Sequence, residues 1–471
     1  MEKVNHKTCD VVVIGAGLTG LTTAYWLKRK GVDVVVVEKS DRTGGQIRTE
    51  QALGFTYETG PTTSAVSTPE VAELMTDLYH VSGGKCQLET APDTAKRRLI
   101  WKDGRFHDLP SGPLKGLTTP LFRLSDKFRI LAEPWRSPGT KQDETVGELA
   151  ARRLGQSFVD YAVDPFISGV YAGDPYQLVT RYALPKLYAL EQEYGSFIRG
   201  AIAKKKQPKT ERDKLATKKV FSARGGMSRI IEALTDYLGP EQILLGCADV
   251  KAEPFVNHKW KTSFTDKAGK LCTIESGYVV TTCGAYALPD ILPFVHPSDM
   301  DPIASLVYAP VMEVNVGVND DHGGDYQAFG GLVPSKEQRR VLGILFPSSC
   351  FSGRAPQGGA LFSFFIGGVR HPEMLRMTDN EVHAWVTEEL HDMLGFPRDV
   401  KPDFIHISRH WQAIPQYRAD SGERFEAVWR LQDGFNGLYV AGNLRDGIGM
   451  GHRITQATNI ATDITNKLNN Q

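Results

Sequence analysis

A short run of glycines near the N-terminus constrains the fold of this chain more than any other feature. Gly15, Gly17 and Gly20 follow an apolar, valine-rich stretch at 10–14 and open a helical pattern over 21–30. A second apolar stretch at 34–37 leads to Glu38. Strand, turn, helix and strand within about 30 residues form a βαβ unit. In such a unit the glycines allow a tight turn, close backbone approach to a pyrophosphate, and close helix–strand packing. The sequence therefore predicts a dinucleotide-binding α/β fold.

A second group of glycines indicates which dinucleotide binds. Arg42 and the pair Gly44-Gly45 follow soon after Glu38, which suits a backbone that meets an extended cofactor twice. Glu38 can accept hydrogen bonds from ribose hydroxyls and repels a 2′-phosphate. Glycines within 442–451 lead into a final helix, whose N-terminus can face the negative edge of a reduced flavin. Because the sequence holds one nucleotide fingerprint, we expect FAD, reduced by an organic substrate and reoxidised by oxygen.

The composition argues against several other classes of protein. The 471 residues are too many for one core, so two or three domains are expected. Lys and Arg number 55, as do Asp and Glu, and this balance argues against a nucleic-acid binder. The six cysteines lack CxxC spacing, so we expect free thiols in a reducing cytoplasm and no metal site. Residues 1–8 lack the apolar segment of a secretory signal, and no apolar run reaches the ~18 residues of a membrane-spanning helix.

The remaining sequence predicts alternating helical and sheet regions. Thr145 is expected to cap a helix over 145–161, with Glu148 completing a capping box. The strongly basic segment 204–219 is interpreted as a mobile loop, with an anionic-lipid contact as the alternative. Alternating residues predict a sheet within 308–369. Further helices are expected at 125–134, 182–202, 227–238, 379–394 and 454–468, and further strands at 278–282 and 438–442.

These motifs resemble those of a known group of flavoenzymes. The fingerprint at 15–20, Glu38, Arg42-x-Gly44-Gly45 and Ala441-Gly442 are similar to motifs of amine oxidases, phytoene desaturases and protoporphyrinogen oxidases. Further segments resemble the oxygen-dependent protoporphyrinogen and coproporphyrinogen oxidases more specifically. Those segments are 168–174 (SGVYAGD), 329–335 (FGGLVPS) with Glu337, 342–343, 353–356, 367–370 and 414–417 (IPQY).

The resemblance implies a fold of α/β and α+β parts in three domains. A discontinuous Rossmann-like FAD domain would comprise residues 8–62, 218–290 and 431–471. A substrate-binding domain, built on an antiparallel sheet, would comprise 63–110 and 291–430. A helical domain of the membrane-facing type would span 111–217, and the active site would lie between the three.

The resemblance also implies which residues line the site. Val250 would contact the adenine side of FAD through its backbone, and Ile448, Gly449 and Met450 would lie beside the flavin. With the glycine motifs, the expected cofactor-binding residues are Gly15, Gly17, Leu18, Thr19, Gly20, Glu38, Lys39, Arg42, Gly44, Gly45, Val250, Ala441, Gly442, Ile448, Gly449 and Met450. The expected substrate-binding residues, mostly apolar as suits a flat tetrapyrrole, are Phe166, Gly169, Phe329, Gly330, Leu332, Leu345 and Phe365.

The sequence departs from the family where a substrate propionate would be bound. Some members carry an arginine shortly after the Gly-Pro pair that is 60–61 here, whereas this chain continues with TTSAVS at 62–67. Arg370, Lys336 and Arg48 are alternative anchors for a carboxylate, and Arg48 is also a candidate FAD contact.

The resemblance implies a function in haem synthesis. The chain would oxidise protoporphyrinogen IX to protoporphyrin IX with FAD and oxygen, and coproporphyrinogen III is the alternative substrate. An amine oxidase, a carotenoid desaturase and a flavin-binding scaffold are more distant alternatives. Because the cofactor supplies the reactivity, no catalytic residue is assigned; His371, His410 and His452 are candidates by residue type alone. The chain is expected in the cytoplasm. A peripheral contact with the cytoplasmic face of the membrane, a homodimer and product hand-over to ferrochelatase stay open.

Overall fold

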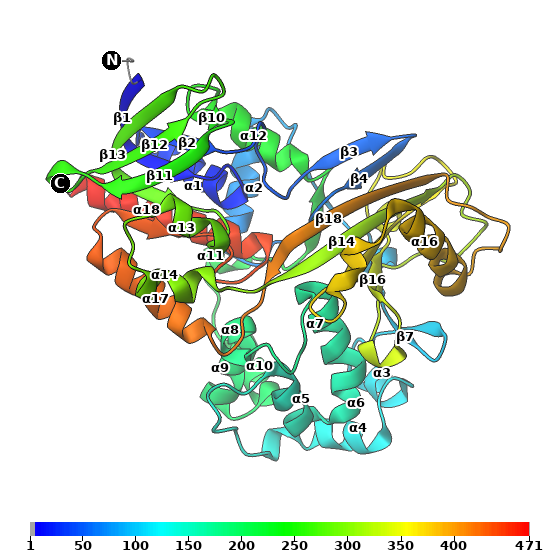
Figure 1. Cartoon of the computed structure of the whole chain (residues 1–471). Helices are drawn as coiled ribbons and strands as arrows, with labels where there is room; N and C mark the ends of the chain where they lie inside the picture. The colour runs from blue at the N-terminus through cyan, green and yellow to red at the C-terminus, as the bar shows by residue number, and fades with distance from the viewer. Residues whose placement is uncertain (1–4, 471) are drawn as a thin grey trace.

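The structure, a computed structural model, describes residues 5–470, which form three parts (Figure 1). One part is a layered α/β unit that contains both ends of the described chain. The second is built on a long sheet, and the third is a group of helices below that sheet in the view of Figure 1. The expectation that residues 1–8 hold no secretory signal falls partly on residues outside the described range.

The α/β unit is a sheet in the order β10-β2-β1-β13-β12-β11, with β19 also paired to β13. The pairs β10–β2, β2–β1, β1–β13 and β13–β19 are parallel, whereas β11, β12 and β13 pair antiparallel. The strands are β1 (Asn5–Ile14), β2 (Val34–Glu38), β10 (Ile243–Leu245), β11 (Ala248–Pro254), β12 (Trp260–Thr265), β13 (Leu271–Thr281) and β19 (Leu438–Val440). Strands far apart in the sequence therefore meet in one sheet.

Helices and a hairpin bury both faces of this sheet. Val11 and Val13 pack on one face with helices α1, α2, α12 and α18, and Val12 packs on the other with the β11–β12 hairpin and helices α13, α14 and α17. Because both faces of the sheet are buried, the sequences of β1 and β2 contain continuous apolar runs rather than alternating apolar and polar residues. These helices are α1 (Leu18–Arg29), α2 (Pro69–Val81), α12 (Ser228–Leu238), α13 (Leu288–Ile291), α14 (Pro297–Ala304), α17 (Ser421–Gly434) and α18 (Met450–Asn469).

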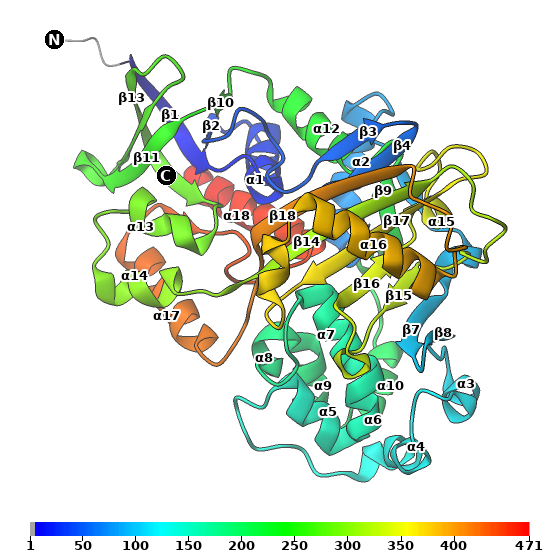
Figure 2. The ribbon, with the colours of Figure 1, turned by 45° about the vertical axis from the view of Figure 1, so that its right-hand side comes forward.

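The long sheet has the strand order β18-β14-β17-β16-β15-β7-β8 and is antiparallel except at the β15–β7 pair. Met312 and Val314 point to the face that α16 covers (Figure 2), so Glu313 between them points to the opposite face. The elements are β7 (Arg98–Lys102), β8 (Arg105–Asp108), β14 (Tyr308–Val318), β15 (Gly330–Leu332), β16 (Val341–Leu345), α15 (Pro347–Cys350), β17 (Ala360–Gly367), α16 (Asp379–Leu394) and β18 (Phe404–Pro415).

Two small sheets connect the larger parts. They contain β3 (Thr49–Ala52) with β4 (Phe55–Glu58), and β9 (Val220–Ala223) between β5 (Ser64–Ala65) and β6 (Leu88–Thr90).

The helical part is held together by a buried ion-pair cluster. The guanidinium group of Arg153 is fully buried and pairs with the carboxylates of Glu133 and Glu191. Glu133 also accepts hydrogen bonds from the Ser196 hydroxyl and the Phe197 amide. The helices of this part are α3 (Pro113–Thr118), α4 (Leu124–Leu131), α5 (Val146–Leu154), α6 (Gln156–Phe158), α7 (Asp164–Tyr171), α8 (Thr180–Ala183), α9 (Pro185–Tyr194) and α10 (Phe197–Lys206), with a 3₁₀ turn at Glu133–Trp135 and a π-helical turn at Val159–Val163. The short helix α11 (Glu211–Lys214) follows and packs against α2 of the α/β unit.

The structure confirms the mixed α/β fold and most expected elements, and corrects four. The helix expected over 145–161 is interrupted at Gly155, where α5 ends, and the helix expected over 182–202 is divided among α8, α9 and α10. The capping box of Thr145 and Glu148 is present, and the helix at 379–394 has the expected bounds. The interpretation of 204–219 as a loop is wrong, because α10 continues to Lys206 and α11 follows, capped by the Thr210 hydroxyl. The last helix begins at Met450 rather than 454, since Gly449 occupies its N-cap position. The domain boundaries stay predictions. Among the described helices, none is long and apolar enough to cross a bilayer.

Candidate functional site

A cavity of about 1470 Å³ lies where the three parts meet. It begins at the turn between β1 and α1, passes β11 at Val250, and reaches the glycine turn before α18. From there it extends to a largely apolar region between α7 and the long sheet, lined by Val170, Leu342 and Phe365. One cavity therefore joins the fingerprint turn to a compartment of the kind that accepts a flat apolar ligand.

The three fingerprint glycines are needed for different reasons. Gly15 has φ +107°, and a Cβ there would lie 2.7 Å from Thr282 Oγ1. A Cβ at Gly20 would lie 1.9 Å from the Gly15 carbonyl oxygen, so both glycines are required by packing within the protein. A Cβ at Gly17 would meet no protein atom within 4 Å, and Gly17 lines the cavity. The space beside Gly17, at the N-terminus of α1, therefore suits a ligand's phosphate groups.

Glu38 ends β2 at the edge of the cavity, close to this turn. Its carboxylate accepts hydrogen bonds from the Ala16 amide at 2.7 Å and the Ser40 amide at 2.8 Å. Each carboxylate oxygen can accept more than one hydrogen bond, so the group can still receive ribose hydroxyls.

The second glycine pair packs directly on the first turn. Gly44 and Gly45 have positive φ angles of 103° and 59°, and the Gly44 amide donates to the Ala16 carbonyl at 2.8 Å. Arg42 donates to the carbonyls of Thr43 and Gly45, so its guanidinium braces this turn. The pair lies close to Gly17, since a Cβ at Gly45 would come within 3.3 Å of the Gly17 Cα.

The distant glycine turn is ordered by an arginine that the sequence did not single out. Arg453, in the first turn of α18, donates to the carbonyls of Gly442, Arg445 and Gly447. Its Nε atom is buried without a partner, and burial lowers the pKa of its guanidinium. Because Arg453 also lines the cavity, it presents positive charge at the end where Ile448 meets the ligand space.

The structure brings most of the expected cofactor residues to this cavity. Gly20, Arg42 and Ala441 do not line it: Gly20 packs helix on strand, Arg42 braces a turn, and Ala441 is fully buried. The expected residues that do line it are Gly15, Gly17, Leu18, Thr19, Glu38, Lys39, Gly44, Gly45, Val250, Gly442, Ile448, Gly449 and Met450. The cavity and its glycine turns fit an extended dinucleotide, although the individual contacts stay predictions.

The expected substrate residues divide into two groups. Gly169 and Phe365 line the cavity. The cavity is not lined by Gly330, Leu332 or Leu345. The strand register nevertheless places these three residues on the same face of the sheet as Phe365. Leu332 pairs with Gly343, which pairs with Phe365, and Gly330 pairs with Leu345 on the same strands. Leu332 also packs against Gly169, where a Cβ would lie 2.4 Å from its Cδ2 atom.

Two aromatic residues of this set lie elsewhere. Phe166 on α7 is exposed, and Phe329 packs with Ala95 and Cys350 away from the cavity. Their roles as substrate contacts stay predictions that the observed positions do not favour.

None of the three alternative propionate anchors points a free charge at the cavity. Arg370 pairs with Asp164 at 2.6 Å, Lys336 pairs with Asp160 at 2.6 Å, and Arg48 pairs with Glu50. All three side chains that the sequence suggested as propionate anchors are therefore already paired with carboxylates of the protein.

Of the three candidate histidines, His410 lines the cavity. Its Nε2 atom lies 2.7 Å from the Thr59 carbonyl, and burial lowers the pKa of its imidazole. His371 is exposed beside Glu373, and His452 is not among the residues that line the cavity. Within residues 5–470, no cluster of three or more His, Cys, Asp or Glu side chains could hold a metal ion.

A buried carboxyl group in the cavity wall was missed by the sequence analysis. Glu313 of β14 is 1% exposed, lines the cavity, and has an Oε1 atom without a hydrogen-bond partner. Burial raises the pKa of this carboxyl well above its ordinary value, and the nearby Glu58 adds to the shift. A charged residue within the apolar run 311–318 was the signal that could have found it.

The comparisons with known proteins agree with this geometry. Residues 18–464 match the family described as flavin containing amine oxidoreductase. The chain is 31% identical to a chloroplastic protoporphyrinogen oxidase of Oryza sativa subsp. japonica, over 98% of this chain and 89% of the relative. It is 24% identical to the coproporphyrinogen III oxidase of Bacillus subtilis, over 96% of this chain and 97% of that protein.

A solved structure shows the same fold. A crystal structure from Exiguobacterium sp. 255-15 superposes with a TM-score of 0.79 at 22% identity, covering 98% of this chain and 99% of the other. The chain therefore belongs to the flavin containing amine oxidoreductase family. It is an FAD-dependent oxidoreductase, and the cavity described above has the size and the glycine turns that FAD requires.

Proposed function

We propose that this chain dehydrogenates a porphyrinogen to the corresponding porphyrin, with protoporphyrinogen IX as its substrate, in haem synthesis. The observation that carries the proposal is a single cavity that joins the dinucleotide turn to an apolar compartment, in a chain similar over nearly its whole length to porphyrinogen oxidases. FAD bound there would accept a hydride, which carries two electrons, from the substrate. The residues of this chain hold the macrocycle against the cofactor and exclude water.

The walls of the cavity bear on which porphyrinogen is used. Its basic side chains are Lys39 and Lys251, at the strands that meet the adenosine end, and Arg453, which is bound to carbonyl groups. The compartment around Phe365 and Leu342 adds no further lysine or arginine within the described residues. Coproporphyrinogen III has two more propionates than protoporphyrinogen IX and would bring two more negative charges. The low positive charge of this compartment therefore favours protoporphyrinogen IX.

The two lysines also bear on the amine-oxidase alternative. An amine oxidase of this family would be expected to place a lysine near the flavin and an aromatic cage around the amine. In the described chain, the lysines that line the cavity lie at the opposite end, beside β2 and β11. This arrangement supports a porphyrinogen over an amine.

The test is direct. The purified yellow protein is mixed in air with each porphyrinogen, and porphyrin fluorescence is followed. We expect faster oxidation of protoporphyrinogen IX, with one flavin bleached per protein when oxygen is excluded. No oxidation of either substrate would overturn the proposal, and an unbleached flavin would favour a non-catalytic scaffold. Four further features of the proposed function stay predictions: oxygen as the electron acceptor, a homodimer, transfer of the product to ferrochelatase, and a cytoplasmic location.

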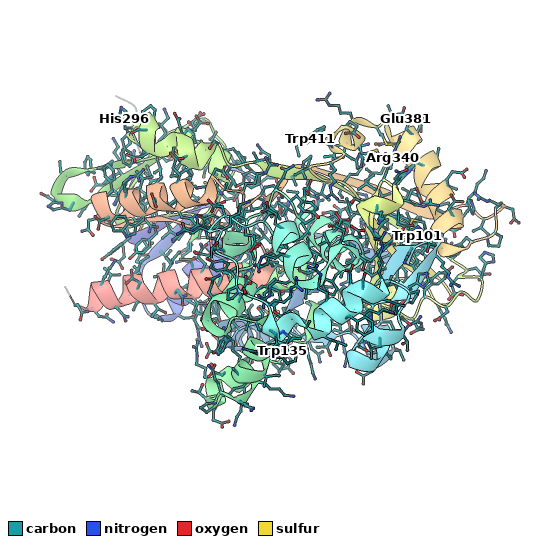
Figure 3. All side chains as sticks on the ribbon, turned by 90° about the horizontal axis from the view of Figure 1, so that it is seen from below. Trp101, Trp135, His296, Arg340, Glu381 and Trp411 are labelled. Atoms are coloured by element: carbon teal, nitrogen blue, oxygen red, sulfur yellow. The ribbon has the colours of Figure 1, made fainter. Side chains whose placement is uncertain are left out.

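We further propose that the helical part contacts a membrane surface. An apolar patch, defined as Leu124, Phe128, Leu131 and Trp135, is 54–78% exposed. Leu124, Phe128 and Leu131 have i, i+4, i+7 spacing and so share one face of α4. Figure 3 places Trp135 on the outer surface of the helical part. Exposed aromatic and aliphatic side chains of this kind suit the interface of a lipid bilayer.

Basic residues of the helical part support an anionic lipid surface. Arg123 directly precedes α4 and is exposed. The N-terminal end of α10 packs against the turn that carries Trp135, and Lys204–Lys206 lie at the other end of that helix. We expect binding to vesicles that contain anionic lipid, and a loss of about tenfold or more in Phe128→Ser and Trp135→Ser, since each removes much of a buried aromatic contact. Trp429→Ser, on exposed α17, is the matched control. Equal binding of all three variants would contradict the proposal.

A further inference from the structure

The cavity wall contains a carboxyl group to which no role has yet been given. Glu313 lies in the middle of β14, where the alternating pattern turns it away from α16 and toward the cavity. A glutamate is rarely buried to 1% exposure unless it is paired. Here the Oε1 atom has no hydrogen-bond partner. Glu313 as a residue lines the cavity, and its partner across the strand pair, Phe365, lines the compartment proposed for the substrate.

The groups around Glu313 do not neutralise it. The buried cation Arg354 is bound at 2.7 Å to the carboxylate of Glu58, the carboxyl group that adds to burial in raising the pKa of Glu313. On β18, the His410 imidazole is bound to the Thr59 carbonyl rather than to Glu313. Among the described residues, Glu313 has no ion-pair partner.

Asn315 is the polar neighbour of Glu313 on the same strand, and a hydrogen bond from its side chain lowers the pKa of Glu313, an effect that burial outweighs. Asn315, two residues along β14, donates to the Glu58 carbonyl and accepts from the Ser363 hydroxyl of β17. The residue directly opposite Glu313 on β17 is Phe365, which offers no donor. Oε1 itself has no hydrogen-bond partner in the described structure, so a ligand in the cavity that Glu313 lines could supply a donor to it.

We propose that Glu313 accepts the pyrrole N–H proton when the porphyrinogen is dehydrogenated, a role that rests on the proposed function. The C–H bond breaks with its electron pair leaving as hydride to FAD. The N–H bond breaks in the same round, its electron pair completes the new C=N bond, and its proton goes to the Glu313 carboxylate. Each round thus removes one hydride and one proton, two electrons in all, and leaves FAD reduced and Glu313 protonated.

The chemistry of the site fits this role. A carboxylate facing pyrrole N–H groups gains the hydrogen bonds that Oε1 lacks in their absence, which favours the ionised form once the macrocycle is bound. A carboxyl whose pKa is raised by burial is also a stronger base in its ionised form than an exposed one. Substrate binding is therefore expected to release a proton, and the reaction returns it.

The test compares Glu313→Gln, which keeps the size and polarity of the side chain, with the wild-type holoenzyme. We expect kcat for porphyrinogen oxidation to fall on the order of 10²–10⁴-fold, with KM changed less and the acidic limb of the pH profile lost. Glu313→Asp should recover part of the rate. Glu389→Gln removes another buried carboxyl whose pKa is raised, on α16 outside the cavity, and should keep the wild-type pH profile.

A second readout does not depend on turnover. The affinity for protoporphyrinogen IX, measured without oxygen on wild-type holoenzyme whose flavin is already reduced, should rise with pH, because the pyrrole N–H groups of this ligand favour ionised Glu313. It should be independent of this titration in Glu313→Gln. Flavin content should be equal in both proteins, since Glu313 lies in the substrate half of the cavity.

The outcomes separate this role from the proposed function. A wild-type protein that oxidises neither porphyrinogen overturns both. Wild-type turnover that Glu313→Gln matches, with the same pH profile, overturns the role of Glu313 alone. A rate loss in Glu313→Gln that is accompanied by an unchanged pH dependence of porphyrinogen affinity also overturns it, because a merely structural role would give that result.

Discussion

Replacing Gly17 by alanine is the sharpest test of where the dinucleotide binds. Gly17 has φ −76° and ψ −179°, which any L-residue adopts, and an added Cβ meets no protein atom within 4 Å. The folded protein without FAD therefore tolerates the methyl group. It should even gain about 0.4–1 kcal/mol, because alanine restricts the unfolded chain more than glycine does.

The same methyl group should interfere with the cofactor. A phosphate oxygen bound to the first amides of α1 lies about 2.9 Å from a nitrogen atom, in the space that the Cβ of residue 17 would enter. We expect FAD affinity to fall at least 100-fold, or about 2.7 kcal/mol. Since FAD at 100 times its Kd stabilises the folded state by about that amount, the variant should lose the thermal shift that FAD gives the wild type.

The assay measures flavin absorbance after purification and unfolding temperature with and without added FAD. Gly434→Ala is the matched control, because Gly434 ends α17 on the surface with open space around its Cα. The expected pattern is a colourless Gly17→Ala protein that unfolds no lower than wild-type apoprotein, beside a yellow Gly434→Ala protein. A yellow Gly17→Ala variant with wild-type FAD affinity would refute the placement of the pyrophosphate.

Three further predictions concern stability. Glu313→Gln should become more stable relative to wild type as pH rises above 4.5, the ordinary carboxyl pKa. The pKa of Glu313 is raised in the folded protein, so wild type is most stable below the pKa of the unfolded chain. It loses up to about 1.4 kcal/mol of stability per pH unit as pH rises from that value toward the pKa of the folded protein. Urea unfolding of both apoproteins across this range measures the effect, and parallel curves would contradict it. Arg153→Met should lose about 3–5 kcal/mol in the same assay, because it leaves Glu133 and Glu191 buried and unpaired; a loss below 1 kcal/mol would show that the cluster is solvated. Thr145→Ala should lose about 0.5–2 kcal/mol through its helix cap, with an unchanged free energy of unfolding as the contrary result.

Features set by neighbouring residues could be predicted from the sequence. The β1-α1-β2 unit, the capping box at Thr145 and the helix at 379–394 depend on local spacing, and all three are present. Local spacing also misled the prediction of where α10 ends, at Lys206. The run 204–206 reads as a polar break in sequence, whereas the structure continues α10 there with three lysines at the favourable C-terminal end.

The cavity depends on tertiary placement, which motifs do not report. Gly330, Leu345 and Phe365 share one face of one sheet, but of these three only Phe365 lines the cavity. On β16 the cavity is lined by Leu342, near the opposite end of the strand from Leu345. Glu313 was overlooked because a single glutamate in a strand usually faces solvent. Its burial follows from α7 and the FAD-binding part covering that face of the sheet, a contact between segments far apart in the chain.

The order of the strands has a consequence for how this protein is made. β1 pairs with β13, with Asn5 opposite Cys272, and β13 pairs in turn with β19 near the C-terminus. The turn that holds Gly442 and the first turn of α18 close the cavity last. A nascent chain still attached to the ribosome thus lacks the wall where the flavin would rest, and long-range pairing of this kind folds slowly. Loading with cofactor is therefore expected to follow release of the finished chain, and a chain cut before residue 438 should never turn yellow.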